Sequence, residues 1–165
     1  MKRRPSHGRE CAGFTIIEVL VTCVIIAVMG SITIAGFAVW LPGYRLKGAV
    51  REMYSNLNQA KIQAIKQHGR VDVTFSTSPS HRYTVPGQSE PIILADRWSG
   101  VLFAGESGQT FGPPSTITFD SRGRSNQTGN WFVYLSNDKN SAYYRLRVQP
   151  AGLVTIEKYD GGWPP

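Results

Sequence analysis

The chain has 165 residues, is 41% hydrophobic and carries a formal net charge of +7. This length allows one folded domain of ordinary size with appended segments, and the apolar content is sufficient for a core. Residues 1–13 contain four basic side chains and one acidic side chain, so this short tract accounts for +3 of the net charge and +4 is left on the rest of the chain. A charge this modest does not by itself indicate a nucleic-acid-binding protein.

A polar, basic tract covers residues 1–13, and an apolar segment follows at residues 14–41. Between Val19 and Leu41 the polar side chains are two threonines and one serine, and none is charged. A helix of this length rises about 34 Å, against a hydrocarbon layer of about 30 Å. The sequence therefore predicts a membrane-spanning helix over residues 14–41, with a kink or break at Pro42 because proline lacks the backbone donor.

Residues 42–69 continue as an amphipathic helix, because apolar side chains recur every three or four positions. The apolar stripe consists of Leu46, Val50, Met53, Leu57, Ala60 and Ala64, with Ile65 beside it. Polar side chains expected to face elsewhere are those of Arg51, Glu52, Asn56, Gln63 and Lys66. We expect the stripe to pack on a sheet and the helix to stop at Gly69.

Beyond Gly69 the apolar period becomes two, which is typical of strands. The expected strands cover residues 71–75, 82–85, 92–94, 116–119, 131–135, 142–149 and 153–159. Short turns at 137–140 and 150–152 separate the last three, and these strands therefore predict an antiparallel meander. Residues 76–80, 105–114 and 122–130 are expected to be loops. The fold class predicted is α+β, with one long helix covering one face of a sheet in a β-rich domain of residues 70–165.

The apolar segment opens with the stretch Gly13-Phe14-Thr15-Ile16-Ile17-Glu18, so it contains a carboxylate. A charge at the centre of a membrane helix costs about 2.5–3.5 kcal/mol unless it is paired. Cleavage before Phe14 would create an α-amine that is largely cationic at neutral pH and about 6 Å from Glu18 along the helix. Glu18 could pair with that amine within the chain or with the amine of an adjacent subunit.

Two other interpretations of the same segment concern its charge and its position. Glu18 could be an interfacial carboxylate favoured by the positive end of the helix. The whole segment could be an ordinary secretory signal that is cut near Ala35 or Ala38. An embedded carboxylate and an amphipathic continuation are unusual for a secretory signal, so cleavage at Gly13 is the interpretation we favour.

The stretch from Gly13 to Glu18 resembles the processing site of type IV pilin-like proteins. In that family a prepilin peptidase cuts after the glycine and methylates the new N-terminal residue, and the glutamate supports assembly. The resemblance implies cleavage between Gly13 and Phe14, N-methylation of Phe14 and an assembly role for Glu18. It also implies that residues 1–13 are a leader peptide and that residues 14–41 anchor the chain in the bacterial inner membrane, with residues 70–165 in the periplasm.

Two later stretches resemble the GspH/FimT branch of that family: the helix-to-strand passage over residues 57–75 and the stretch Thr118–Arg124. This resemblance implies a minor pseudopilin of type II secretion, assembled near the tip of a periplasmic filament. Its implied partners are prepilin peptidase, other pilins or pseudopilins, the inner-membrane assembly platform and membrane lipid. A minor type IV pilin in pilus assembly or DNA uptake is the second interpretation. A membrane-anchored periplasmic binding domain is the third.

A DNA contact is considered because some family members bind DNA through a Gly-Arg-x-Arg motif. Here Gly123-Arg124-Ser125-Asn126 keeps the first arginine and lacks the second, although Arg122 stands just before. Arg122 and Arg124 are therefore candidate phosphate contacts. Lys139, Arg145 and Arg147 could extend such a surface, but the strand alternation favours Arg145 and Arg147 as solvated strand residues.

Enzymatic and metal-binding functions find no support in the sequence. His7, His68 and His81 are scattered and lack the ligand spacing of a metal site. The stretch Gly105–Gln109 lacks the second glycine of a nucleophile elbow, and no phosphate-binding lysine follows it. We therefore expect no cofactor, no metal and no catalytic residues.

Overall fold

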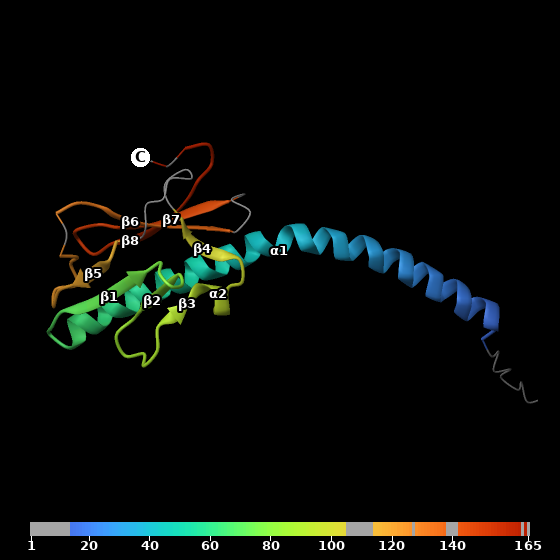
Figure 1. The fold of residues 1–165 in the computed structure, drawn as a ribbon, viewed down its shortest axis with the longest axis horizontal. Coiled ribbons are helices and arrows are strands. Elements are labelled where there is room, and N and C mark those ends of the chain that lie inside the picture. Colours follow the sequence, from blue (N-terminus) through green and yellow to red (C-terminus); the bar gives the residue numbers. More distant parts are fainter. Residues whose placement is uncertain (1–13, 105–113, 127, 138–141, 163, 165) are drawn as a thin grey trace, which may run out of the picture. The chain divides into compact units, whose positions relative to one another are not determined.

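The computed structural model describes residues 14–104, 114–126, 128–137, 142–162 and 164, and it comprises two compact units, Met1–Val39 and Trp40–Pro165 (Figure 1). Helix α1 begins at Ile16, passes through Pro42 and ends at Lys66. Of the kink or break expected at Pro42, the break is wrong, because proline removes one backbone hydrogen bond while the turns on either side keep theirs. None of the helices in the described part of the chain is both long and apolar enough to cross a membrane.

The apolar stripe on the second half of α1 is confirmed. All six of its predicted members are at most 1% exposed: Leu46, Val50, Met53, Leu57, Ala60 and Ala64. Ile65 lies outside the buried face and is 41% exposed, whereas Asn56 is buried although its polarity predicted the opposite. Helical position decides both cases, since Asn56 precedes Leu57 on the covered side and Ile65 follows Ala64 on the open side.

The C-terminal end of α1 is closed by His68 rather than by a glycine in the left-handed region. His68 has φ of 50°, and its N–H donates to the Ile65 carbonyl. The N–H of Gly69 donates to the Ala64 carbonyl at 3.2 Å. These two bonds form a Schellman motif, in which the left-handed position comes one residue before Gly69.

Eight strands follow in the described part of the chain, and they form two four-stranded antiparallel sheets rather than the single sheet expected (Figure 1). The first sheet has the order β3-β2-β1-β5, with β1 at Val71–Ser76, β2 at Arg82–Thr84, β3 at Ile92–Ile93 and β5 at Thr116–Phe119. The second has the order β4-β6-β7-β8, with β4 at Val101–Ala104, β6 at Trp131–Asn137, β7 at Tyr143–Val148 and β8 at Val154–Lys158. The predicted meander is confirmed as β6-β7-β8.

Strand β4 and the short helix α2, Leu94–Arg97, were not expected from the sequence. The run Val101–Ala104 pairs with β6 and so opens the second sheet. The four residues are all apolar and show no alternation of polarity, so their period does not identify a strand. The expected loop at 105–114 and the turn at 137–140 lie almost wholly outside the described residues.

A single hydrophobic cluster joins the buried stripe of α1 to the inner faces of both sheets. Trp98, just after α2, packs at its edge, and the indole N–H donates to the Glu52 carboxylate at 2.5 Å. Arg97 reaches the other oxygen of Glu52 at 2.8 Å. The indole ring fits against α1 because Gly48 has no side chain, and a Cβ there would overlap the ring. This contact fixes α2 on α1.

Asn56 is buried because it has a polar partner inside the globular unit. Its Nδ2 donates to the phenolic oxygen of Tyr83 in β2 at 2.8 Å. Burial raises the pKa of Tyr83 from 10.0 to about 12, and the charge of Glu52 adds to that effect. The neutral phenol is therefore favoured in the folded state.

This raised pKa predicts an alkaline loss of stability. Tyr83 contributes fully below its unfolded pKa of 10.0, and the contribution is lost as the pH rises through about 12. The loss amounts to about 2–3 kcal/mol, since each pKa unit corresponds to about 1.4 kcal/mol. Denaturant titrations at pH 9 and pH 11 measure about half of this loss, roughly 1.4 kcal/mol, because pH 11 lies midway between the unfolded and folded pKa values. Tyr83→Phe is the control. The variant has a lower baseline but lacks this pH-dependent component; an equal loss in both proteins would contradict the assignment.

Candidate functional site

The N-terminal stretch of α1 carries the residues predicted for processing and assembly. Gly13 lies outside the described residues. Phe14, the predicted new N-terminal residue, is 85% exposed, and Glu18 lies in the first turn of α1. The described structure therefore leaves both side chains accessible.

Thr15 caps this helix, which was not expected from the sequence. Its side-chain oxygen accepts from the Glu18 N–H at 3.3 Å, and its carbonyl accepts from the same N–H at 3.1 Å. The sequence Thr15-Ile16-Ile17-Glu18 fits the capping-box signature Thr-x-x-Glu, which could have identified this contact. Glu18 thus has a local position at the positive end of the helix besides its predicted assembly role.

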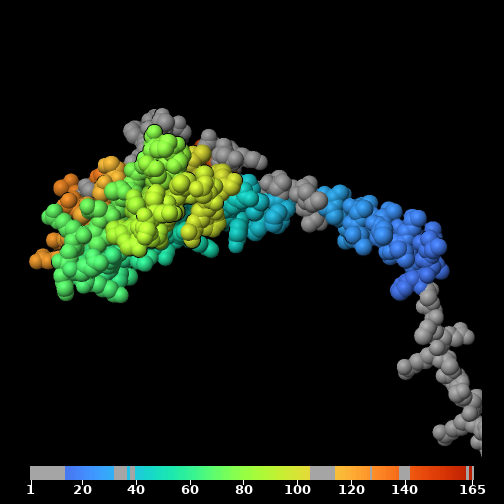
Figure 2. Space-filling model, turned by 60° about the horizontal axis from the view of Figure 1, so that its bottom comes forward, coloured from blue at the N-terminus to red at the C-terminus, as the bar shows by residue number. Residues whose placement is uncertain are grey.

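Exposed apolar side chains occur at most positions between Phe14 and Met29, and their helical spacing distributes them around all sides of α1. Figure 2 draws this segment in blue. The side chains more than half exposed are those of Phe14, Ile16, Ile17, Val19, Leu20, Val24, Ile25, Ile26, Val28 and Met29. A helix that is apolar all round is stable in water only when something covers it. The segment therefore needs lipid or other subunits around it.

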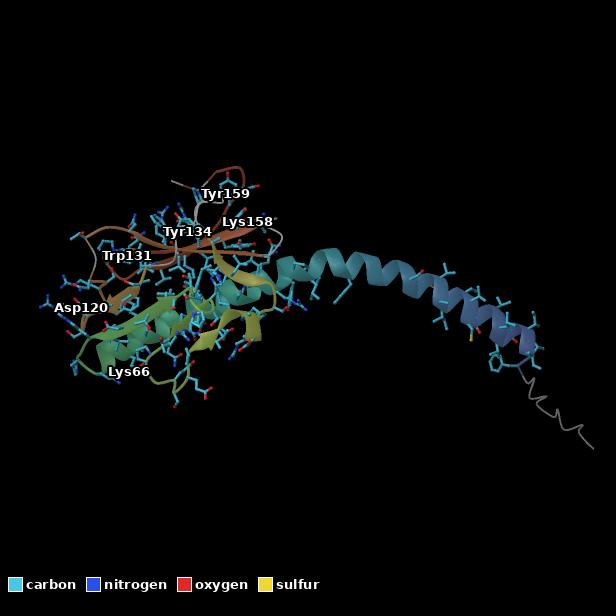
Figure 3. The ribbon with its side chains drawn as sticks, viewed as in Figure 1. Lys66, Asp120, Trp131, Tyr134, Lys158 and Tyr159 are labelled. Atoms are coloured by element: carbon cyan, nitrogen blue, oxygen red, sulfur yellow. The ribbon has the colours of Figure 1, made fainter. Side chains whose placement is uncertain are left out.

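The stretch Thr118–Arg124, singled out in the sequence, forms a tight turn at one end of the globular unit. The Asp120 carboxylate accepts from the N–H groups of Arg122 and Arg124 at 2.8 and 2.9 Å. Gly123 has φ of 76°, and its N–H donates to the Asp120 carbonyl. The Arg124 N–H, and then that of Arg122, hold the pKa of Asp120 below its ordinary value. Figure 3 shows Asp120 at the same end as Lys66.

A second glycine turn, Gln149–Gly152, joins β7 to β8 and touches the first. The Gly152 N–H donates to the Gln149 carbonyl, and Gly152 has φ of 74°. Its Cα faces the Gly123 carbonyl so closely that a Cβ would overlap that oxygen. Lys61 of α1 completes the contact, because its Nζ donates to the Gly152 carbonyl at 2.9 Å. The two turns and α1 form a three-way junction, which we call the glycine junction.

The predicted DNA contacts Arg122 and Arg124 both lie in the glycine junction. Arg124 lines a surface depression of about 450 Å³, together with Arg70, Thr118 and Asn126. The Arg124 Nε is bonded to Asp120 at 3.1 Å, so this guanidinium supports the turn. The turn explains the residue types in this stretch without a ligand, and a phosphate contact stays a prediction.

Arg145 and Arg147 are not solvated strand residues, which corrects the expectation from the sequence. Their side chains are 8% and 16% exposed, and both reach the carboxylate of Glu157 in β8. Strand alternation assigned them to the outer face of the sheet, which is right, but that face is covered. Lys139 lies outside the described residues.

Within the described ranges, no group of three or more histidine, cysteine or acidic side chains could hold a metal ion. His81 serves the fold, because its Nδ1 accepts from the Phe103 N–H at 3.1 Å. This bond links His81, which immediately precedes β2, to Phe103 in β4. Partial burial lowers the pKa of His81 below its ordinary value of 6.5.

Comparisons with known proteins match both regions of the chain. The family model "Type II transport protein GspH" matches residues 49–152, and the "Prokaryotic N-terminal methylation motif" matches residues 8–34. No curated protein matches the chain. Two crystal structures of the type IV minor pilin FimU from Pseudomonas aeruginosa are similar in fold. The first has a TM-score of 0.55 at 13% identity, covering 76% of this chain and 96% of that chain. The second has a TM-score of 0.52 at 13% identity, covering 72% and 97%.

Proposed function

Because this chain belongs to the GspH family of type IV pilin-like proteins, whose model matches more than half of it, we propose that it is a minor pseudopilin of a type II secretion system. In this proposal the chain is a structural subunit without catalytic activity. It is trimmed after Gly13, methylated at Phe14 and assembled near the tip of a periplasmic filament.

The observation that carries the proposal is the order of two matches on one chain. The methylation motif covers the start of α1, and the GspH model begins where α1 becomes amphipathic and ends at Gly152 of the glycine junction. The methylation-motif match also contains the apolar helical segment between Phe14 and Met29, which is of the kind that filament cores bury. The proposed cleavage site, the apolar segment and the globular unit therefore occupy successive stretches of the chain.

The proposed location follows from the same arrangement. Residues 14–41 anchor the unassembled subunit in the inner membrane, and the β-rich domain of residues 70–165 lies in the periplasm. The partners are prepilin peptidase, other pilins or pseudopilins, the assembly platform and, before extraction, membrane lipid. Glu18 pairs with the α-amine created by cleavage, which neutralises two charges inside the filament.

Processing is the first step that can be tested. Co-expression with a prepilin peptidase should yield a chain that begins at Phe14 and carries one N-methyl group, as measured by intact mass and N-terminal sequencing. Gly13→Val should block the cut, because the enzyme is expected to read that position. Gly8→Val, in the same leader, is the matched control and should be cut normally. A mature chain that begins near Ala35 or Ala38 would instead indicate a secretory signal.

A minor type IV pilin is the second candidate, and the fold of FimU favours it as much as the first. Both candidates predict the same processed chain. They differ in the filament that the subunit enters, so co-purification with a major pseudopilin or with a major pilin distinguishes them. DNA contact through Arg122 and Arg124 belongs to the second candidate alone.

A further inference from the structure

The solvent side of α1 carries a row of glutamines that the proposed function does not use. Gln59, Gln63 and Gln67 are spaced four residues apart, so they lie one above another on one face of the helix. Within the described residues, none of the three side-chain amides makes a hydrogen bond. Each amide has a carbonyl acceptor and two N–H donors. We call these three residues the glutamine row, and its hydrogen-bonding groups are open to water or to a ligand.

A turn after β2 forms the opposite wall of a groove along the glutamine row. The groove has a volume of about 360 Å³ and is lined by the row, by Ile62 and by residues 85–88 of the turn. The Gln88 N–H donates to the Val85 carbonyl at 3.2 Å, and Gly87 has φ of 90°. Pro86 followed by a glycine at positive φ is typical of a type II turn. This volume is within the range of ligand-binding pockets.

The 85–88 turn is held beside α1 by contacts within the globular unit. Tyr83, just before the turn, accepts a hydrogen bond from Asn56 of α1, and Val85 is buried in the hydrophobic cluster. Gly87 faces the middle of the row, since a Cβ there would lie 3.7 Å from Gln63 Nε2. The absence of a side chain at Gly87 leaves this space open. The groove is therefore formed before a ligand binds, which lowers the entropy cost of binding.

The spacing of the glutamine row matches that of an extended peptide. Residues four apart in a helix are separated by about 6 Å along its axis, and alternate residues of a strand repeat every 6.6 Å or about that. Successive amides of the row can therefore face every second peptide group, each accepting from an N–H and donating to a carbonyl. Lys66, labelled in Figure 3, is the charged residue among those lining the groove. The lining thus suits an uncharged backbone.

We propose that the groove between the glutamine row and the 85–88 turn binds an extended, uncharged peptide segment of a partner protein through its backbone. The row contacts peptide groups rather than side chains, so segments of different sequence fit the same surface. Ile62 supplies an apolar contact inside the groove and is 51% exposed without a ligand. This inference concerns the globular unit alone and does not rest on the proposed function.

The test is an NMR titration of the full chain in detergent with the capped peptide acetyl-Thr-Ala-Thr-Ala-Thr-Ala-amide. The side-chain amide signals of the glutamine row should shift together and fit one Kd. The amide of Asn56, which is bonded to Tyr83, is the internal control and should not shift. Two further peptides carry N-methyl groups on the threonines or on the alanines. One of them should bind about tenfold more weakly than the parent peptide, because the N–H groups that face the row are lost.

Gln63→Met provides the second measurement, because it removes the middle amide and keeps a long, unbranched side chain that suits a helix. It should weaken binding of the parent peptide about tenfold. Arg51→Met is the matched control, since Arg51 is an exposed residue of the same helix and does not line the groove. It should bind like the wild type, and circular dichroism confirms folding of both variants.

Three results would overturn the proposal. The first is an absence of peptide-dependent shifts in the glutamine row. The second is equal binding by Gln63→Met and the wild type, or equal binding of the parent peptide and both methylated peptides. The third comes from a separate titration with N,N'-diacetylchitobiose: shifts of the row with this sugar and not with the peptide would indicate a glycan surface instead.

Discussion

Replacing Gly152 with alanine is expected to lower the free energy of unfolding by about 2–5 kcal/mol, from strain in the left-handed region together with overpacking. The new Cβ would overlap the Gly123 carbonyl oxygen and lie 3.3 Å from the Arg124 Cα. These are backbone atoms in a closed turn, so they cannot rotate away. Relief would require separation of the two turns, which would break the bond from Lys61 to the Gly152 carbonyl.

Alanine substitutions at two other glycines distinguish the cost of backbone strain at positive φ from the cost of steric overlap. Gly87 also has a positive φ, 90°, but a Cβ there would meet only the Gln63 amide, at 3.7 Å and beyond. Gly87→Ala should therefore cost about 1–2 kcal/mol. At Gly129 a Cβ meets nothing within 4 Å, so Gly129→Ala should be close to neutral. Urea titrations of the three variants measure these differences. If Gly152→Ala and Gly87→Ala lowered the free energy of unfolding equally, the steric overlap in the glycine junction would have no measurable cost, which would contradict the prediction.

The glycine junction was only partly predictable from the sequence. Pro150-Ala151-Gly152 predicted a turn, and the loop expected over residues 122–130 includes Gly123, because turns and loops have their own residue preferences. That the two turns touch depends on the pairing of β5 with β1 and of β7 with β8, which is a long-range property. The sequence therefore indicated the parts of the junction, but not their contact with each other or with Lys61.

Long-range partners also explain the errors at Arg145 and Asn56. Alternation placed Arg145 correctly on the outer face, and helical position shows that Asn56 is on the covered face of α1. Neither pattern contains the distant groups that make burial tolerable, which are Glu157 and Pro164 for Arg145 and Tyr83 for Asn56. A buried polar side chain requires such a partner. Local period therefore predicts which face a residue occupies, but not whether that face meets solvent.

The features of the N-terminal stretch are local in sequence. The proposed cleavage and methylation would depend on the residues adjoining Gly13, and the capping contact between Thr15 and Glu18 spans three positions. The partner of the Glu18 carboxylate is not a local feature of this kind. If that partner is an amine on another subunit, the structure of a single chain does not contain it, so the pairing has to be tested by filament assembly.

Glu18→Ala is expected to be processed normally and to be lost from filaments. Inside a filament the change would leave the α-amine of Phe14 without its counter-charge, and breaking a buried pair costs about 3–5 kcal/mol. An energy of that size shifts an assembly equilibrium by more than a hundredfold. The fraction of subunit in sheared filaments measures incorporation, and intact mass shows whether cleavage and methylation occurred. Processed Glu18→Ala chains that enter filaments like the wild type would refute the pairing.

Thr15→Ala and Glu18→Gln distinguish assembly from helix capping. Thr15→Ala removes the side-chain bond to the Glu18 N–H at a cost of about 0.5–2 kcal/mol and keeps the carboxylate. If Glu18 acts by its charge, Thr15→Ala chains enter filaments and Glu18→Gln chains do not. If Glu18 acts only at the helix end, the two variants fail to a similar, small extent.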